Sequence, residues 1–176
     1  MRVHQIHDFL YKKVSIAPLV VLRIAFGALM LFSIFRYTEQ SWISELYMEP
    51  TYHFSFISWL KPLDGIGMYL VFAIMGVNAV CMILGLFYRV NTLSLLLLFV
   101  YTELLDKTYY LNHYYLVSVL LFWMSIVPAH RYYSLDSRIF PGIRSSQCAN
   151  WCVLIFKAQL SVVYFYAGLA KVNPDW

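Results

Sequence analysis

Charge is scarce in this chain of 176 residues, because only 12% of them are Asp, Glu, Lys or Arg. Soluble domains carry about a quarter. Hydrophobic residues make up 61% of the chain and aromatic residues 19%. A soluble domain of this length could not bury so much apolar surface. The composition therefore predicts an integral membrane protein, with the lipid bilayer as its first partner.

Cysteine is also rare, and the three cysteines do not suggest a disulfide framework. Cys81 lies inside an apolar run, and Cys148 and Cys152 are four residues apart, which is not the C-x-x-C redox spacing. We interpret them as packing residues, with a reactive thiol as the alternative. No dense His/Cys cluster, catalytic-triad spacing or phosphate loop is found, so no metal is predicted. The net charge of +4 is dispersed, which argues against nucleic acid as a partner.

Apolar runs predict an all-α, polytopic membrane protein of about five transmembrane helices. A helix rises 1.5 Å per residue, so about 20 residues cross a hydrocarbon core about 30 Å thick. The predicted spans are 16–35, 65–87, 91–105, 114–127 and 151–172. Residues 1–15 have no signal-peptide core and predict an amphipathic, interfacial lead-in. Residues 36–63 predict a long loop with interfacial helices, and one membrane domain occupies 16–176.

Basic residues are divided unequally between the two sides of this topology. Seven lie with the amino terminus: Arg2, Lys12, Lys13, Arg89, Arg131, Arg138 and Arg144. Four lie on the other side: Arg36, Lys61, Lys107 and Lys171. Cytoplasmic loops carry the excess of Lys and Arg. The count therefore predicts a cytoplasmic amino terminus and a periplasmic or lumenal loop after the third span.

Residues 101–116, which include that loop, form a polar stretch between two apolar runs. The stretch contains five tyrosines together with Glu103, Asp106, Lys107, Asn112 and His113. Desolvation at the end of a span favours the neutral form of a lysine, which can act as a base. A histidine can relay protons, and an asparagine can stabilise an oxyanion. The alternative is that Asp106 and Lys107 form an ordinary interfacial pair, with Lys107 snorkelling.

Three other polar residues stand out in apolar surroundings. Arg23, inside the first span, is expected to face a protein partner in a structural or site-supporting role, unless it snorkels. Asn78 is expected to form a hydrogen bond between helices. His53, in an aromatic run, either packs as a satisfied histidine or lines a site.

The segment 106–116 resembles the D-K-T-x-x-x-N-H-x-Y-L motif of vitamin K-dependent gamma-glutamyl carboxylases, within the wider horizontally transferred transmembrane (HTTM) domain family. Arg23–Leu31 resembles the family's R-F-x-F-G-L-L-M, and Leu84–Arg89 resembles L-G-L-x-Y-R. His130–Asp136 resembles H-Y-W-S-V-D with one extra residue, and Gln159–Trp176 resembles Q-x-x-x-V-Y-F-x-A-G-x-x-K-x-x-x-D-W. Five motifs in order, over nearly the whole chain, make the resemblance specific.

The resemblance implies a paired reaction, in which reduced vitamin K, a menaquinol-type hydroquinone, is oxidised by O2 while CO2 is added to a glutamate of a peptide or protein substrate. It implies that Lys107 is the base that deprotonates the hydroquinone, with Asn112 and His113 supporting it. The residues expected to support the site are Arg23, Asp106, His53, His130 and Gln159. Glu103 departs from the family pattern, and we expect it to pair with Lys107 and keep the amine charged.

The family continues beyond the D-W stretch, so we expect these residues to be a fragment of a longer protein. The tyrosine-rich, short-looped style indicates a bacterial homologue in the inner membrane. Two alternatives remain: a quinone-linked redox or maturation protein of the same fold without carboxylation, and a non-enzymatic membrane module such as a transporter subunit. The second alternative predicts broken helices and polar groups at mid-membrane.

Overall fold

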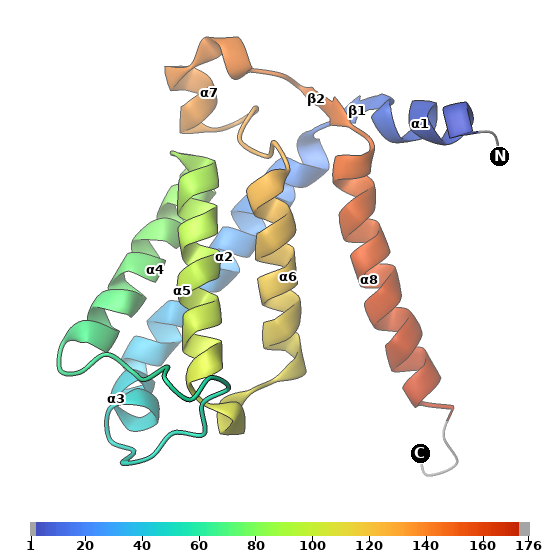
Figure 1. Ribbon diagram of the computed structural model, residues 1–176. Coiled ribbons are helices and arrows are strands. Elements are labelled where there is room, and N and C mark those ends of the chain that lie inside the picture. Colours follow the sequence, from blue (N-terminus) through green and yellow to red (C-terminus); the bar gives the residue numbers. More distant parts are fainter. Residues whose placement is uncertain (1–2, 173–176) are drawn as a thin grey trace.

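The computed structural model describes residues 3–172, in which helices are joined by loops and one small two-stranded sheet (Figure 1). The chain runs through α1 (Val3–Tyr11), β1 (Lys13–Ser15), α2 (Ala17–Glu39), α3 (Trp42–Tyr47), α4 (Gly67–Leu84), α5 (Tyr88–Leu105), η1 (Lys107–Tyr109), α6 (Asn112–Ile126), α7 (Leu135–Ile139), η2 (Pro141–Ile143), β2 (Gln147–Ala149) and α8 (Trp151–Ala170). Arg2 and the Asp175-Trp176 end of the last motif lie outside the described residues. The predicted all-α class is confirmed.

Each of the five predicted spans is a long helix in the structure. Helices α2, α4, α5 and α6 pack in that order, α2 against α4, α4 against α5 and α5 against α6. Among the residues described, three helices are long and apolar enough to cross a membrane: α2, α4 and α8. Helix α5 equals α4 in length, with 18 residues, and α6 has 15. The five helices were predicted correctly, and three of them meet the composition of a membrane span.

The α2–α4 and α4–α5 contacts depend on small and polar residues. A Cβ atom at Gly27 would lie 2.7 Å from Cγ1 of Ile83, so glycine allows α2 and α4 to approach closely. Asn78 of α4 is 5% exposed and donates from Nδ2 to the hydroxyl of Ser94 on α5 at 2.9 Å. The predicted hydrogen bond between helices is therefore confirmed, with Ser94 as its acceptor.

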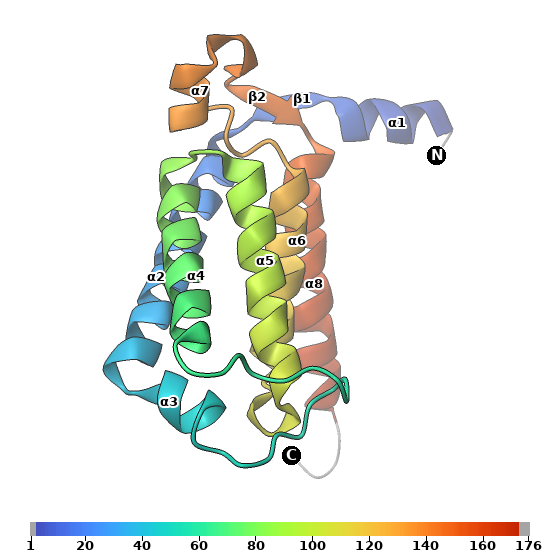
Figure 2. The same ribbon diagram turned by 60° about the vertical axis from the view of Figure 1, so that its left-hand side comes forward.

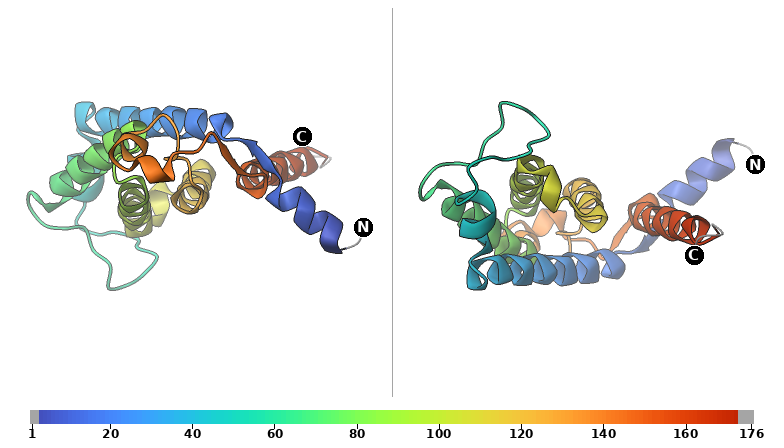
Figure 3. Two further views of the ribbon diagram at one scale, coloured as in Figure 1. Left: turned by 90° about the horizontal axis from the view of Figure 1, so that it is seen from above. Right: turned by 90° about the horizontal axis from the view of Figure 1, so that it is seen from below.

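Helix α8 stands apart from the other long helices (Figure 3). Only 11% of its most apolar window is buried, against 39% for α2 and for α4. The start of α8 is held by β2, which pairs antiparallel with β1, Val14 opposite Cys148. Cys148 and Cys152 are free, buried thiols at this junction, so their interpretation as packing residues is confirmed. Burial raises the pKa of the Cys148 thiol.

The two regions predicted to be interfacial, residues 1–15 and residues 36–63, differ in their helix content. Helix α1 projects from the bundle beyond β1 (Figure 2), with Ile6 44% and Phe9 52% exposed, as expected of an amphipathic lead-in. The first long loop holds a single short helix, α3, where several were expected. Residues 48–66 form no helix, because backbone hydrogen bonds to α5, described below, hold part of this segment extended.

Arg23 fixes the end of the bundle at which α4 turns into α5. Its side chain is 0% exposed, and Nη2 donates to the carbonyl of Tyr133. The snorkelling alternative is therefore wrong. Gly85, which ends α4 with φ +64°, leaves the space that the guanidinium occupies. The three motifs that begin at Arg23, Leu84 and His130 thus converge here.

Asp136 completes this junction from the same segment as Tyr133. Its carboxylate is buried and accepts the backbone N–H groups of Phe87 at 2.8 Å and Tyr88 at 3.0 Å, the first of α5. Its own N–H donates to the carbonyl of Gly85 at 3.0 Å. A carboxylate in this position satisfies donors that have no partner within the helix. Asp136 therefore caps α5 from a distant part of the chain.

We predict that Gly85→Ala strongly destabilises the protein. A Cβ atom there would lie 1.7 Å from Nη1 of Arg23 and 2.5 Å from Cβ of Ser134. The left-handed backbone alone costs a non-glycine residue roughly 1–2 kcal/mol, which corresponds to roughly 2–8 °C in Tm for a chain of this size. The steric clash adds to this loss. Thermal unfolding in detergent measures the change.

Gly142→Ala is the matched control, because a Cβ atom at Gly142 meets nothing within 4 Å. Its Tm should stay close to that of the wild type. Equal Tm values for Gly85→Ala and the wild type would contradict the close packing of Gly85 against Arg23.

Candidate functional site

Asp106 ends α5 and sets the direction of the chain that follows. Its backbone is extended, with φ −149° and ψ 123°, and its Oδ1 accepts the N–H of Thr108 at 2.9 Å and the hydroxyl of Thr108 at 2.7 Å. An aspartate that accepts from the residue two positions on forms a turn of its own side chain and backbone. Asp106 and Thr108 of the D-K-T motif thus have a structural role, and they place Lys107 at the first position of η1.

The first long loop is fastened to this turn by its backbone. The N–H of Lys107 donates to the carbonyl of Phe54 at 2.9 Å, and the N–H of Phe56 donates to the carbonyl of Leu104 at 3.0 Å. Farther along the loop, the hydroxyl of Tyr101 donates to the carbonyl of Lys61 at 2.9 Å. Two points of attachment therefore hold the loop across the end of α5.

His53 joins the same turn. Its Nδ1 lies 3.4 Å from Oδ2 of Asp106, and the two side chains are 14% and 5% exposed. The separation is that of an ion pair, but Nδ1 is not aligned for a hydrogen bond. The structure thus brings together His53, Asp106 and Lys107, three of the predicted site residues. The alternative that Asp106 pairs with Lys107 is wrong, since the carboxylate faces His53.

The Asp106 carboxylate is stabilised by the donors around it. Burial alone would raise the pKa of this carboxyl, but the N–H and hydroxyl of Thr108, with the backbone of Phe54 and the ring of His53, hold the pKa below its ordinary value. Hydrogen bonds to the charged form of an acid act in this direction. Asp106 is therefore ionised at neutral pH and adds a negative charge beside Lys107.

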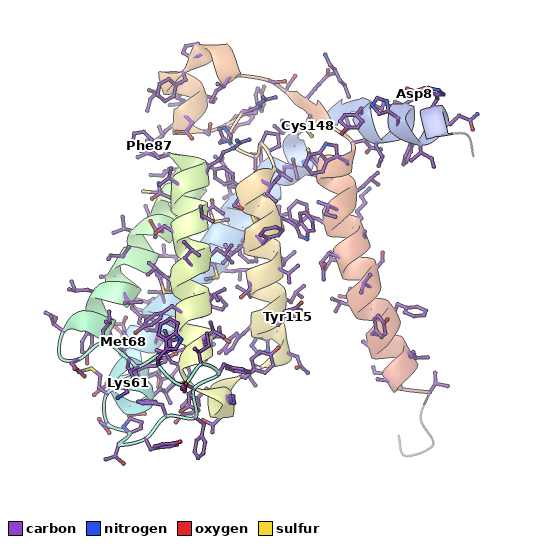
Figure 4. All side chains as sticks on the ribbon, viewed as in Figure 1. Asp8, Lys61, Met68, Phe87, Tyr115 and Cys148 are labelled. Carbon is purple, nitrogen blue, oxygen red and sulfur yellow. The ribbon has the colours of Figure 1, made fainter. Side chains whose placement is uncertain are left out.

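The first long loop forms most of the wall of a cavity of about 880 Å³, and Lys107 completes it. Its wall carries aromatic rings, among them Phe54 and Phe56, and two amines, Lys61 and Lys107. Figure 4 shows Lys61 at this end of the bundle. The Nζ atom of Lys107 lies 5.3 Å from the centre of the Phe56 ring, a cation–π contact. Lys107 is exposed, so contacts within the protein do not provide the desolvation that was expected.

Asn112 and His113 begin α6, beyond η1. Both side chains are exposed, and neither lines the cavity. The ring of His113 packs edge-on against Tyr114, with 4.5 Å between ring centres. The structure thus places these two predicted catalytic residues at the same end of the bundle as Lys107, but outside the cavity that Lys107 lines.

Glu103 faces the interior of the bundle. With Tyr37, Tyr47 and Tyr114 it lines a small cavity of about 20 Å³, in which the hydroxyls of Tyr37 and Tyr114 lie 3.3 Å apart. A cavity of this size can hold one water molecule. No ion pair joins Glu103 to Lys107 in the described chain, so the pairing predicted for them is not seen. Sequence reasoning missed this cluster of Glu103 and three tyrosines, because its four members come from four different helices.

Three predicted supporting residues lie away from the cavity. Arg23 and His130 lie at the other end of α5, where His130 stacks on Tyr88 and Arg23 binds the carbonyl of Tyr133. At 1.5 Å per residue, α5 separates the two ends by about 27 Å, and Figure 4 shows Phe87 and Lys61 at these opposite ends. The ring of His130 stacks on Tyr88 with 5.4 Å between centres, and burial lowers the pKa of His130. Gln159 is part of α8 and is half-buried.

The end of α8 places a further lysine, Lys171, on the side of the bundle at which α5 and η1 end (Figure 1). It belongs to the last of the five motifs. Within residues 3–172 no group of three or more His, Cys, Asp or Glu side chains is arranged to hold a metal ion.

A family model described as the HTTM domain matches residues 11–176, nearly the whole chain. No solved structure matches the chain.

We predict that Asp106→Asn lowers the free energy of unfolding by roughly 1.5–3 kcal/mol at neutral pH, the value of hydrogen bonds to a charged group. Because the pKa of Asp106 is lowered in the folded state, its stabilisation is present above the ordinary pKa of about 3.9. It is lost as the pH falls through the lowered value. The difference in Tm between wild type and variant should therefore shrink in acid.

Asp64→Asn is the control, since Asp64 is exposed on the wall of the same cavity. It should follow the wild type throughout the pH range. A difference for Asp106→Asn that stays constant from neutral pH to strong acid would show that the charge of this carboxylate does not hold the turn.

Proposed function

Because the chain belongs to the HTTM domain family, the family of vitamin K-dependent carboxylase-related proteins, we propose that it is a membrane enzyme that couples oxidation of a hydroquinone by O2 to the carboxylation of glutamate side chains with CO2. The single observation that carries the proposal within the structure is the cavity formed largely by the first long loop. Lys107 of the D-K-T motif lines it.

The cavity suits a hydroquinone of the vitamin K type. Its volume of about 880 Å³ lies in the range of small-molecule sites, about 300–1,000 Å³. The rings of Tyr52, Phe54 and Phe56 offer flat apolar surfaces to an aromatic ring system, and the amine of Lys107 can contact one of its oxygen atoms. A prenylated quinol would reach the cavity from the adjoining lipid.

When bound, the hydroquinone supplies, through its oxidation by O2, the strong base that removes the γ-proton of a glutamate. The chain's own contribution begins at Nζ of Lys107, which in its neutral form takes the proton of a hydroquinone hydroxyl. The ring of Phe56, 5.3 Å away, then stabilises the resulting ammonium group. Asp106, ionised and held by Thr108, keeps the turn in place while Lys107 changes charge.

Lys171 is a second candidate for the base. It follows α8 at the same end of the bundle and lies in a family motif. General acid–base catalysis contributes about 10²–10⁴-fold to a rate. Removal of the true base should therefore reduce both products by about that factor, while removal of another amine should not.

We predict that Lys107→Ala lowers epoxide formation and the incorporation of labelled CO2 into a glutamate peptide together, by about 10²-fold or more. Membranes that carry the protein from its complete gene, supplied with vitamin K hydroquinone, provide the assay. Lys61→Ala is the control, because Lys61 lines the same cavity. It should stay within a few-fold of the wild type.

Lys171→Ala is measured beside them. Loss of both products in Lys171→Ala, with full activity in Lys107→Ala, would contradict the assignment and identify Lys171 as the base. Hydroquinone consumption without incorporation of CO2 would instead support a quinone-linked redox or maturation protein of the same fold. A wild-type protein that consumes no hydroquinone would overturn the proposed reaction.

A further inference from the structure

A second cavity, of about 380 Å³, lies at the end of the bundle opposite Lys107. It is formed by the chain around α7 and η2, and Tyr132, Tyr133, Arg138 and Arg144 are part of its wall. No acidic side chain lines it. The lining therefore combines two guanidinium groups with two aromatic rings, and it has no built-in countercharge.

The two arginines have no ionic partner in the described part of the chain. Both are exposed, and neither Arg138 nor Arg144 forms an ion pair there. Asp136, the nearest carboxylate along the chain, is 5% exposed and accepts the N–H groups that begin α5. Arg144 lies over the ring of Tyr132, with its Cζ 5.8 Å from the ring centre. The cavity thus presents two guanidinium groups without an ionic partner, one of them placed over the Tyr132 ring.

The surface around the cavity is positively charged, like the cavity wall itself. Six basic residues at this end are exposed: Lys12, Lys13, Arg89, Arg131, Arg138 and Arg144. Within residues 3–172, Asp8 is the exposed carboxylate of the same end. Basic residues gathered beside membrane helices attract anionic lipids. An anion that approaches the cavity is therefore drawn in by the whole face.

Apolar side chains stand next to the arginines. Ile139 is 55% exposed and Phe140 is 51% exposed, both between Arg138 and Pro141 of the cavity wall. Tyr133 is 75% exposed. Exposed apolar and aromatic side chains beside cations are typical of segments at headgroup depth. A free phosphate ion would leave these apolar side chains without a contact, whereas a lipid would cover them.

We propose that this cavity binds the phosphate of an anionic phospholipid headgroup. Arg138 and Arg144 donate charge-assisted hydrogen bonds to the phosphate oxygens, a geometry that suits guanidinium groups. Ile139 and Phe140 contact the upper part of the acyl chains. The site lies about 27 Å from the Lys107 cavity, by the length of α5, and does not depend on the proposed reaction.

A ligand in this cavity would contact the same segment that binds Arg23. The cavity wall includes Tyr133, whose carbonyl accepts from Arg23, and it is continuous with Asp136, which caps α5. A headgroup that holds this segment in place therefore stabilises the attachment of α2 to the α4–α5 turn. A ligand that binds only the folded state raises the unfolding temperature.

The test is the Tm of the purified full chain in a neutral detergent, with and without short-chain phosphatidylglycerol. Short-chain phosphatidylcholine and inorganic phosphate serve as the two other additions. We expect phosphatidylglycerol to raise the Tm of the wild type by several degrees, with little change from the other two. Native mass spectrometry of the same samples should show retained phosphatidylglycerol.

The variants are R138Q/R144Q, R138K/R144K and Arg89→Gln. Arg89 is exposed at the same end but does not line the cavity, so Arg89→Gln should keep the full shift. R138Q/R144Q should lose it, and R138K/R144K should keep part of it. Each shift is taken against the same variant without lipid, so a change in basal stability does not affect the comparison.

Three outcomes would overturn the proposal. They are an unchanged phosphatidylglycerol shift in R138Q/R144Q, an equal shift with phosphatidylcholine in the wild type, and an equal shift with inorganic phosphate. The last would identify a soluble phosphate compound as the ligand of the same arginines.

Discussion

A buried arginine is the interaction on which the rest of this structure depends. A guanidinium group in an apolar interior must find acceptors, because its water is lost on folding. Arg23 finds the carbonyl of Tyr133, and Gly85 leaves the space for it. The segment that supplies this carbonyl also supplies Asp136, which caps α5. Together these contacts hold α2, the α4–α5 turn and the start of α5. The far end of α5 then positions Asp106 and the turn that carries Lys107.

The long helices were predictable because each is a run of apolar residues, and a charged residue in such a run needs a partner. Sequence reasoning could state that Arg23 has a partner, but not that the partner is a backbone carbonyl of Tyr133. Motif order along the chain does not tell which end of a helical bundle each motif occupies. The β1–β2 pairing was missed for a related reason, since Val14 and Cys148 lie far apart in sequence and three-residue strands leave no periodic signal.

At the candidate site, the sequence placed Asp106, His53 and Lys107 correctly in one region. It failed for Glu103, which was expected to pair with Lys107. Helix α5 ends at Leu105, so the two residues do not share a helix, and Glu103 points toward tyrosines instead. Asn112 lies outside the cavity because η1 turns the chain before α6 begins. The hydrogen-bonded turn made by the Asp106 carboxylate separates Glu103 from Lys107 and precedes α6, and its geometry cannot be read from sequence spacing.

The two-stranded sheet between α1 and α8 has a mechanical consequence. Helix α8 touches the bundle mainly near its start, and β2, which directly precedes α8, is paired with β1, which directly follows α1. The sheet therefore ties the end of α1 to the start of α8 at one end of the bundle, although the two helices lie near opposite ends of the chain. A change in the tilt of α8 would act directly on the backbone pairing that also positions α1.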